Sequence, residues 1–243
     1  MDLGNAVFVT GAGVSVESGI QPFRGPNGIW EENPMEMASY RKFNSDPGHF
    51  LSWYYHRFVS CREAIPNAAH HYLAQHNFRV ITQNVDGLHR KAGHPDPHLI
   101  EIHGCIHHMR RVNATERHHL ELAKWDSVDE ANLVPSLFKY FEIGEGGQID
   151  LETSYRPHIL LFDEYYSELY EITKAQQWVM DADTVVFMGT SNSVGITANI
   201  LSMAVYDSKK IVVVDPKPVS SLCVPGAKVY EMSASSFCSS LKI

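Results

Sequence analysis

The sequence lacks most of the features that mark secreted, membrane-embedded or nucleic-acid-binding proteins. Its 243 residues include only four cysteines and no C-x-x-C pair, so neither a disulfide framework nor a cysteine zinc site is predicted. No apolar run approaches the ~18 residues of a membrane span, and no basic segment precedes the first apolar stretch. We therefore expect a reduced, cytoplasmic protein without a signal peptide.

An excess of positive charge is absent as well. Lysine and arginine number 20 against 28 acidic residues, which gives a formal net charge of −8. This balance argues against general binding to nucleic acid or to a membrane surface. The hydrophobic content of 44% and the length fit a globular chain with one large domain, or a domain with a smaller insert.

Short apolar runs rich in valine and isoleucine alternate with helix-like stretches. The candidate strands are Ala6–Thr10, Phe78–Thr82, His98–Ile102, His158–Phe162, Thr184–Met188, Ile211–Val214 and Lys228–Glu231. The candidate helices are Pro47–Cys61, Ala68–His76, Ser167–Met180, Ile196–Tyr206 and Ala234–Leu241. The alternation predicts an α/β fold, a Rossmann-like parallel sheet with helices on both faces. Its strand-end loops should gather along one edge, where such sheets bind ligands.

Two stretches, Gly25–Phe50 and Cys105–Arg156, do not fit the alternation. We interpret them as a small subdomain inserted twice into one catalytic domain. The large part would cover about 1–24, 62–104 and 157–243, and the small subdomain about 25–61 and 105–156.

A glycine turn follows the first strand. Gly11 permits a tight turn, and Gly13 lets the backbone approach a phosphate closely. The third glycine of the common dinucleotide fingerprint is replaced by Val16, and the best acidic candidate for a ribose is Asp215 at the end of a later strand. The alternative is an ordinary strand–helix turn with structural glycines.

The loop after this turn carries Phe23 and Arg24. The phenyl ring can shield a reactive carbon from water, and the guanidinium can reach a phosphate or carboxylate. The alternatives are a core phenylalanine and a surface arginine.

Polar residues follow three further strands. Asn84 can hold a water or a ribose hydroxyl, Asp86 can accept from an amide N–H, and His103 is placed to act as a general base near neutral pH. The alternatives are a helix cap with a turn glycine and a structural histidine. The run Gly189–Ser191 offers small groups that can cradle a phosphate or ribose.

These motifs together resemble those of the sirtuins, which are NAD-dependent protein lysine deacylases. The matching segments are TGAGVSVESGIQPFRG, TQNVDGLH, HG at 103–104, RPHILLFDE and GTSNSV. They stand in the family's order and cover nearly the whole chain.

The resemblance implies that NAD is a consumed co-substrate and that the products are free lysine, nicotinamide and acyl-ADP-ribose. The pyrophosphate would lie on Gly11–Gly13, and His103 would deprotonate a ribose hydroxyl while Asn84 positions ribose or water. The residues assigned to NAD are Gly11, Ala12, Gly13, Ser15, Ile20, Phe23, Arg24, Gln83, Asn84, Asp86, Gly189, Thr190, Ser191 and Asp215.

The partner that the resemblance implies is an acyl-lysine protein or peptide. Phe162 and Val194 lie in the segments that resemble the family's peptide-binding strands. Tyr54 and Arg57 match a Y-x-x-R of sirtuins that remove malonyl and succinyl groups, since arginine can bind a distal carboxylate. The alternative is an amphipathic helix with an aromatic core face and a surface arginine.

The chain also departs from the family. The four zinc cysteines are missing, so we expect a subdomain without zinc; the pairs His107–His108 and His118–His119 are either metal ligands or solvated surface. Asp163 and Ile196 replace a usual glycine and proline, which bears on the peptide preference. Two alternatives therefore stay open: an enzyme that ADP-ribosylates protein or hydrolyses NAD, and a nucleotide-binding module without catalysis.

Overall fold

The computed structural model describes residues 3–21, 34–192 and 194–241. Its main sheet has six parallel strands in the order β3-β2-β1-β7-β8-β9. The strands of this sheet are β1 (Ala6–Thr10), β2 (Arg79–Thr82), β3 (Leu99–Glu101), β7 (Thr184–Met188), β8 (Lys210–Val214) and β9 (Lys228–Tyr230). Each of them lies within two residues of a predicted strand.

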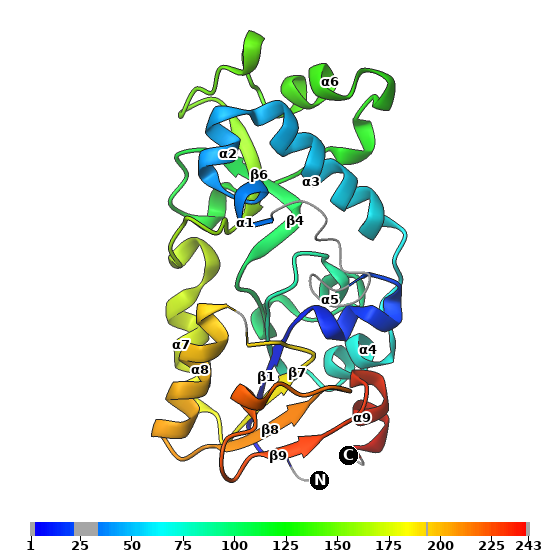
Figure 1. Ribbon diagram of the computed structural model, residues 1–243, viewed down its shortest axis with the longest axis vertical. Coiled ribbons are helices and arrows are strands. Elements are labelled where there is room, and N and C mark those ends of the chain that lie inside the picture. Colours follow the sequence, from blue (N-terminus) through cyan, green and yellow to red (C-terminus); the bar gives the residue numbers. More distant parts are fainter. Residues whose placement is uncertain (1–2, 22–33, 193, 242–243) are drawn as a thin grey trace.

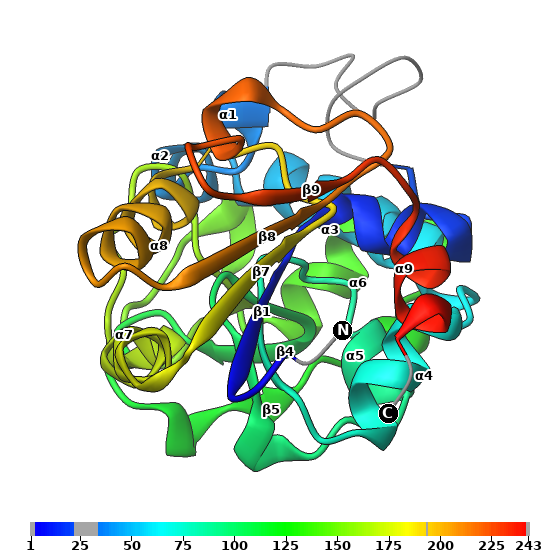
Figure 2. The ribbon, with the colours of Figure 1, turned by 90° about the horizontal axis from the view of Figure 1, so that it is seen from below.

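Helices cover both faces of this sheet, so the predicted fold class is confirmed. The helices α7 (Ile172–Asp181) and α8 (Gly195–Tyr206) lie on one face, and α4 (Ala68–Gln75) and α9 (Ala234–Ser240) on the other (Figure 2). Every residue of β1 and of β7 is buried, because a strand with helices on both faces meets no water. A separate hydrophobic cluster fills the space on each side.

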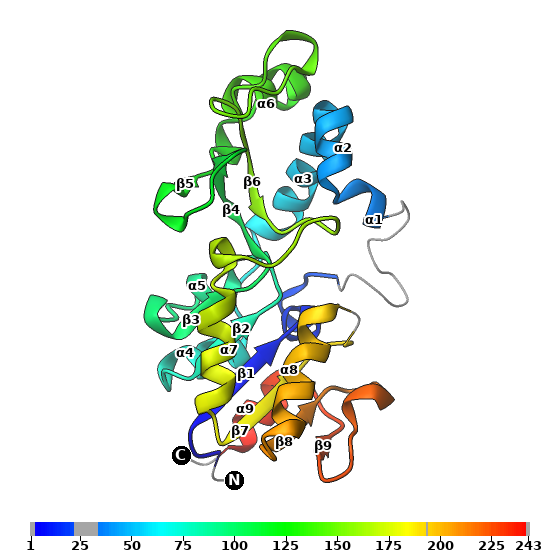
Figure 3. The same ribbon diagram turned by 90° about the vertical axis from the view of Figure 1, so that its left-hand side faces the viewer.

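A second, antiparallel sheet of three strands lies at the other end of the molecule, in the upper part of Figures 1 and 3. It consists of β4 (Gly104–Arg111), β5 (Glu121–Leu122) and β6 (Tyr155–Ile159). It packs with aromatic residues of α3 (Pro47–Arg62) in a hydrophobic cluster of its own. The residue boundaries of the two parts stay a prediction.

One predicted strand is wrong. Residues His158–Phe162 were expected in the parallel sheet, but the strand is Tyr155–Ile159 and it pairs antiparallel with β4. The reason is Arg156, which is buried in this strand and makes two hydrogen bonds to the carboxylate of Glu164, at 2.6 and 2.8 Å. The carboxylate that neutralises this charge lies eight positions further along the chain, and the apolar pattern of the strand itself does not reveal it.

The remaining helices are short, apart from α3. They are α1 (Pro34–Met37), α2 (Tyr40–Ser45), α5 (Leu88–Lys91) and α6 (Leu133–Tyr140). Local capping explains two helix starts. Asp46 accepts from the backbone of His49 ahead of Pro47 in α3, and Asn67 forms a capping box with His70 in α4. Across the described ranges, we find no helix with the length and apolar character of a membrane span.

Candidate active site

The order of strands reverses between β1 and β7, and this switch point positions the candidate site. From β1 the chain adds β2 and β3 on one side, and later β7, β8 and β9 on the other. Such a switch point leaves a crevice at the carboxyl ends of the strands, where ligand sites of open α/β sheets lie.

Glycines in the loops after β1 and β7 allow these two loops to contact each other at the switch point. The backbone nitrogen of Gly13 donates to the carbonyl of Gly189 at 2.8 Å. A Cβ on Gly13 would lie 2.7 Å from the Cα of Gly189, and a Cβ on Gly11 would lie 2.7 Å from the carbonyl oxygen of Gly189. Gly11 and Gly13 therefore allow the backbone to approach the loop after β7. The sequence analysis had predicted a close approach to a phosphate and did not identify this loop.

A cleft of about 960 Å³ opens at this edge and runs towards the second sheet. The predicted residues that line it are Gly11, Ala12, Gly13, Tyr54, Arg57, Gln83, Asn84, His103, Phe162, Gly189, Thr190, Ser191, Val194 and Asp215. Its volume is at the upper end of that of small-molecule sites. Residues from both sheets thus contribute to one cavity.

Three predicted residues lie beside this cleft instead of in its wall. Ser15, Ile20 and Asp86 line an adjoining cavity of about 10 Å³, which shares Asn84 and Arg57 with the larger one. Phe23 and Arg24 lie outside the described residues.

A buried hydrogen-bond network connects the glycine turn to the polar segment after β2. The amide nitrogen of Asn84 donates to the carbonyl of Gly11 at 3.0 Å and to the hydroxyl of Ser15 at 3.1 Å. Since a carbonyl only accepts, this contact fixes the amide orientation and leaves the side-chain oxygen of Asn84 as the acceptor for a ligand hydroxyl or water.

The same network holds Asp86. Its carboxylate accepts from the Ser15 hydroxyl at 2.7 Å and from the backbone nitrogen of Leu88 at 2.9 Å, at the start of α5. The second contact is the helix-cap geometry that the sequence left as an alternative, and it does not exclude a ligand. Burial raises the pKa of this carboxyl, and the hydrogen bonds from Leu88 and Ser15 oppose the rise.

His103 lies between the two sheets, after β3. Its Nδ1 is 2.9 Å from the carbonyl oxygen of Gln83, and its Nε2 is 2.8 Å from the hydroxyl of Tyr166. Gln83 is held in turn by side-chain bonds to Thr190 and Thr197, both at 3.1 Å. Burial lowers the pKa of His103 to about 4, below the near-neutral value expected from the sequence. The imidazole is therefore neutral at physiological pH, as a proton acceptor must be.

Tyr54 and Arg57 place a hydroxyl and a guanidinium at the far wall of the cleft. They lie one helical turn apart on α3 and are only 2% and 8% exposed. The Arg57 guanidinium lies 5.8 Å from the ring centre of Trp53. Burial lowers the pKa of Arg57, which shows how poorly this site solvates a cation. The surface position that the sequence left open for Arg57 is excluded.

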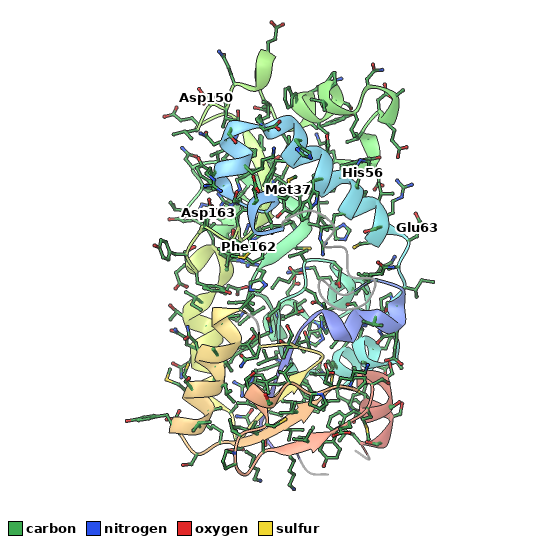
Figure 4. The ribbon with its side chains drawn as sticks, viewed as in Figure 1. Met37, His56, Glu63, Asp150, Phe162 and Asp163 are labelled. Atoms are coloured by element: carbon green, nitrogen blue, oxygen red, sulfur yellow. The ribbon has the colours of Figure 1, made fainter. Side chains whose placement is uncertain are left out.

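Phe162 and its neighbour Asp163 lie where the loop after β6 meets the start of α2, close to Met37 (Figure 4). The backbone nitrogen of Phe162 donates to the carbonyl of Ala38 at 2.9 Å. The Asp163 carboxylate accepts from the backbone nitrogens of Tyr40 at 2.6 Å and Arg41 at 3.1 Å. An aspartate at this position therefore has a structural role, as a cap for α2.

The residues present do not fit a cysteine zinc site. Three of the free cysteines, Cys61, Cys105 and Cys238, are buried on three different elements, and Cys223 is exposed outside the helices and strands. Over residues 3–21, 34–192 and 194–241, the one group with metal-ligand spacing is Glu116, His118 and His119, and all three are exposed. His107 is directed elsewhere, since its Nε2 lies 3.2 Å from the carbonyl oxygen of Asp86.

The cleft wall also contains side chains that the sequence analysis did not assign to the site, among them Trp53, Glu164 and Tyr166. Trp53 and Glu164 are direct neighbours of residues that were singled out, so a wider reading of both motifs would have included them. Tyr166 had no local signal, because its partner His103 is 63 positions away in the chain.

The comparisons with known proteins agree with this geometry. The sequence model of the Sir2 family matches residues 11–195. An NAD-dependent deacetylase of Dictyostelium discoideum, sir2E, is 34% identical over 84% of this chain, which spans 64% of the length of that relative. An NAD-dependent protein deacylase of Bacteroides thetaiotaomicron is 32% identical over 89% of this chain and 87% of its own.

Solved structures give the same result. A Sir2 homologue crystallised with NAD superposes with a TM-score of 0.77 at 27% identity, over 96% of this chain and 86% of its own. The chain therefore belongs to the Sir2 family, the sirtuins, whose members compared above are NAD-dependent protein deacetylases and deacylases.

Proposed function

We propose that this protein is an NAD-dependent protein lysine deacylase, with negatively charged acyl groups such as succinyl and malonyl as its leading substrates. One observation carries the proposal. The glycine turns of the switch point, the neutral imidazole of His103 and the buried pair Tyr54 and Arg57 all line the same cleft.

The cleft offers suitable groups for each part of NAD. The adenosine end would lie at Gly189, Thr190, Ser191 and Asp215, with the pyrophosphate on Gly11–Gly13. One oxygen of the Asp215 carboxylate accepts from the backbone of Lys217 at 2.7 Å, so the other remains an acceptor for a hydroxyl. Ser15, Ile20 and Asp86 would hold the nicotinamide, and Asn84 a ribose hydroxyl.

The chain's own residues then direct the chemistry. NAD supplies an activated ribose carbon, from which nicotinamide leaves as the acyl oxygen of the substrate lysine attacks. His103 would take a proton from a ribose hydroxyl at Nε2, because Nδ1 already carries the proton that is donated to Gln83. Phe162 and Val194 would flank the substrate lysine at the mouth of the cleft.

A carboxylate on the acyl chain would meet Arg57. A buried guanidinium favours an anionic partner, and the planar donor fork of arginine can bind a carboxylate through two hydrogen bonds. Tyr54 would add a hydroxyl to the same group.

The test is mass spectrometry of one peptide that carries either acetyl-lysine or succinyl-lysine, incubated with the enzyme with and without NAD. We expect loss of the acyl group only with NAD, release of nicotinamide, and a faster reaction with the succinyl peptide. Nicotinamide release with both peptides unchanged would favour NAD hydrolysis, and a mass gain on the peptide would favour ADP-ribosyl transfer. No nicotinamide under any condition would indicate a binding module without catalysis.

A further inference from the structure

A short surface segment between β4 and β5 brings three metal-ligating side chains together. Glu116, His118 and His119 are exposed and lie in or directly before a single 3-10 turn, Arg117–His119. The ligand atoms that the three side chains offer all lie within 4.8 Å of one another. None of the three residues lines the cleft, so this cluster is separate from the candidate active site.

The two neighbouring imidazoles are directed to the same side of the chain. Successive side chains of a 3-10 turn are about 120° apart around its axis, so neighbouring histidines would ordinarily diverge. Here the ring centres of His118 and His119 lie only 3.8 Å apart, with 49° between the ring planes. Both rings can therefore reach one ion, which the sequence alone left open.

Glu116 and His118 already have the separation of two ligands on one ion. The Nδ1 of His118 lies 3.0 Å from Oε2 of Glu116. Two ligands about 2.0–2.2 Å from the same ion, at angles between square and tetrahedral, lie about 2.8–3.6 Å apart. The exposed side chain of His119 needs only a rotation about its own bonds to bring the third ligand atom into this range.

The lone pairs of these groups are sufficient for an ion. A carboxylate only accepts, so Nδ1 of His118 carries the hydrogen that is shared with Glu116. A neutral imidazole has one N–H, and in a side chain that is 63% exposed this hydrogen can move through water to Nε2. Nδ1 then offers its one lone pair to the ion, Glu116 offers a carboxylate oxygen, and no atom is used twice.

Arg117 anchors the segment from the other side. Its guanidinium lies 3.1 Å from the carboxylate of Glu171 and donates to the carbonyl of Leu169 at 3.3 Å. The backbone nitrogen of Leu120 closes the turn with a bond to the carbonyl of Arg117 at 3.0 Å. Because Glu171 neutralises the guanidinium, the nearest positive charge on this segment opposes a bound cation only weakly.

We propose that Glu116, His118 and His119 bind one divalent transition-metal ion, with Zn²⁺ as the expected ion. Imidazole nitrogens suit zinc, copper and nickel, whereas magnesium and calcium take oxygen ligands. Three protein ligands leave a further position for water, so the site is open to solvent. It differs from a cysteine zinc site in its ligands, and it does not rest on the proposed function.

The first test is calorimetric titration of the metal-free protein with zinc chloride in a buffer that does not chelate metals. We expect His118→Gln/His119→Gln to bind one zinc ion fewer than wild type, or to bind it at least about ten-fold more weakly, since even the loss of an outer-shell partner costs that much. The matched control is His56→Gln/His71→Gln, which removes two exposed histidines from α3 and α4. The control should bind zinc as wild type does.

The second test identifies the ligands. Nitrogen-15 NMR of the imidazoles should show zinc-dependent shifts of His118 and His119 in wild type. Glu116→Gln keeps the shape of the side chain and removes its charge, so it should weaken zinc binding in the same titration. Magnesium chloride at the same concentration should shift neither ring, because the site offers only one oxygen ligand.

Each outcome bears on the site itself. Circular dichroism in EDTA should be the same for all of these proteins, since the changed side chains are exposed and an exposed ion pair contributes little to stability. Equal zinc binding by wild type and His118→Gln/His119→Gln would contradict the proposal. So would an equal loss in the His56→Gln/His71→Gln control, because zinc would then bind surface histidines without preference. Deacylation is not a readout here, so its absence would leave these results unaffected.

Discussion

The carboxylate of Asp163 lies 2.6 Å from the backbone nitrogen of Tyr40, 123 positions away in the chain. With a second bond to Arg41, it satisfies two of the free N–H groups at the start of α2. The negative charge also suits the positive end of the helix dipole. The contact fixes the loop that carries Phe162 against the segment before α2.

Removal of this cap should weaken both stability and peptide binding. Asp163→Ala is expected to lower the free energy of unfolding by about 1 kcal/mol, the usual worth of a helix cap, and to raise KM for the peptide. Asp163→Asn keeps an oxygen acceptor and should lose less on both counts. Urea unfolding and steady-state kinetics measure the two effects. Equal stability of Asp163→Ala and wild type would show that the contact does not stabilise the helix.

Asp86 should matter for nicotinamide if its carboxylate faces that group. Asp86→Asn is expected to raise KM for NAD roughly ten- to one-hundred-fold, the range for a hydrogen bond to a charged group, and to slow nicotinamide exchange. Ser15→Ala, which removes one donor to this carboxylate, should have a smaller effect in the same direction. An unchanged KM in Asp86→Asn would leave Asp86 as a cap for α5 only.

His103 should be needed for one half of the reaction only. His103→Ala is expected to slow deacylation by about 10²- to 10⁴-fold, as the loss of a general base does, and to spare nicotinamide–NAD exchange. Radiolabelled nicotinamide and peptide mass spectrometry measure the two steps separately. Parallel loss of both would mean that the histidine has a structural role.

Arg57 should set the acyl preference. Arg57→Met keeps an unbranched side chain and removes the charge, so the succinyl peptide should lose at least ten-fold in kcat/KM while the acetyl peptide changes little. Arg62→Met is the matched control, because Arg62 lies on the same helix but is exposed and pairs with Glu63. A wild type that prefers the acetyl peptide would contradict the carboxylate site.

Buried histidines should make the fold sensitive to acid. Three buried histidines form a cluster. The ring centre of His89 lies 4.8 Å from that of His70 and 5.9 Å from that of His94. Burial lowers the pKa of His70 from 6.5 to about 4, and it lowers the pKa of His89 and His94 as well. Below pH 6.5 these histidines bind protons in the unfolded chain but stay neutral in the folded one. Their contribution to the free energy of unfolding is therefore complete above pH 6.5 and is lost as the pH falls.

The slope should be about 1.4 kcal/mol per histidine for each pH unit. Urea unfolding between pH 8 and pH 5 measures it. His70→Gln should reduce the slope by about the contribution of one histidine. The variant should fold, because glutamine can replace His70 in the capping box of α4. His56→Gln, at an exposed position on α3 (Figure 4), should leave the slope unchanged. A flat profile in the wild type would contradict the prediction.

The sequence by itself determined the parallel sheet and the residues at its strand ends. Runs such as Ala6–Thr10 and Thr184–Met188 are apolar throughout, because helices cover both faces of the sheet, and this pattern is local. The carboxyl ends of parallel strands meet at one edge, so the glycine turn, Asn84 and His103 could be placed together before any coordinates.

Only the tertiary structure decided which of these groups touch. The shift of β6 to Tyr155–Ile159 depends on Glu164, which neutralises a buried arginine. The cap on α2 comes from Asp163, and the phenol on His103 comes from Tyr166. The contact of Asp163 joins residues 123 positions apart, and that of Tyr166 joins residues 63 positions apart. A hydrogen bond depends on distances of a few tenths of an ångström between such segments, and no local pattern of residues encodes those distances.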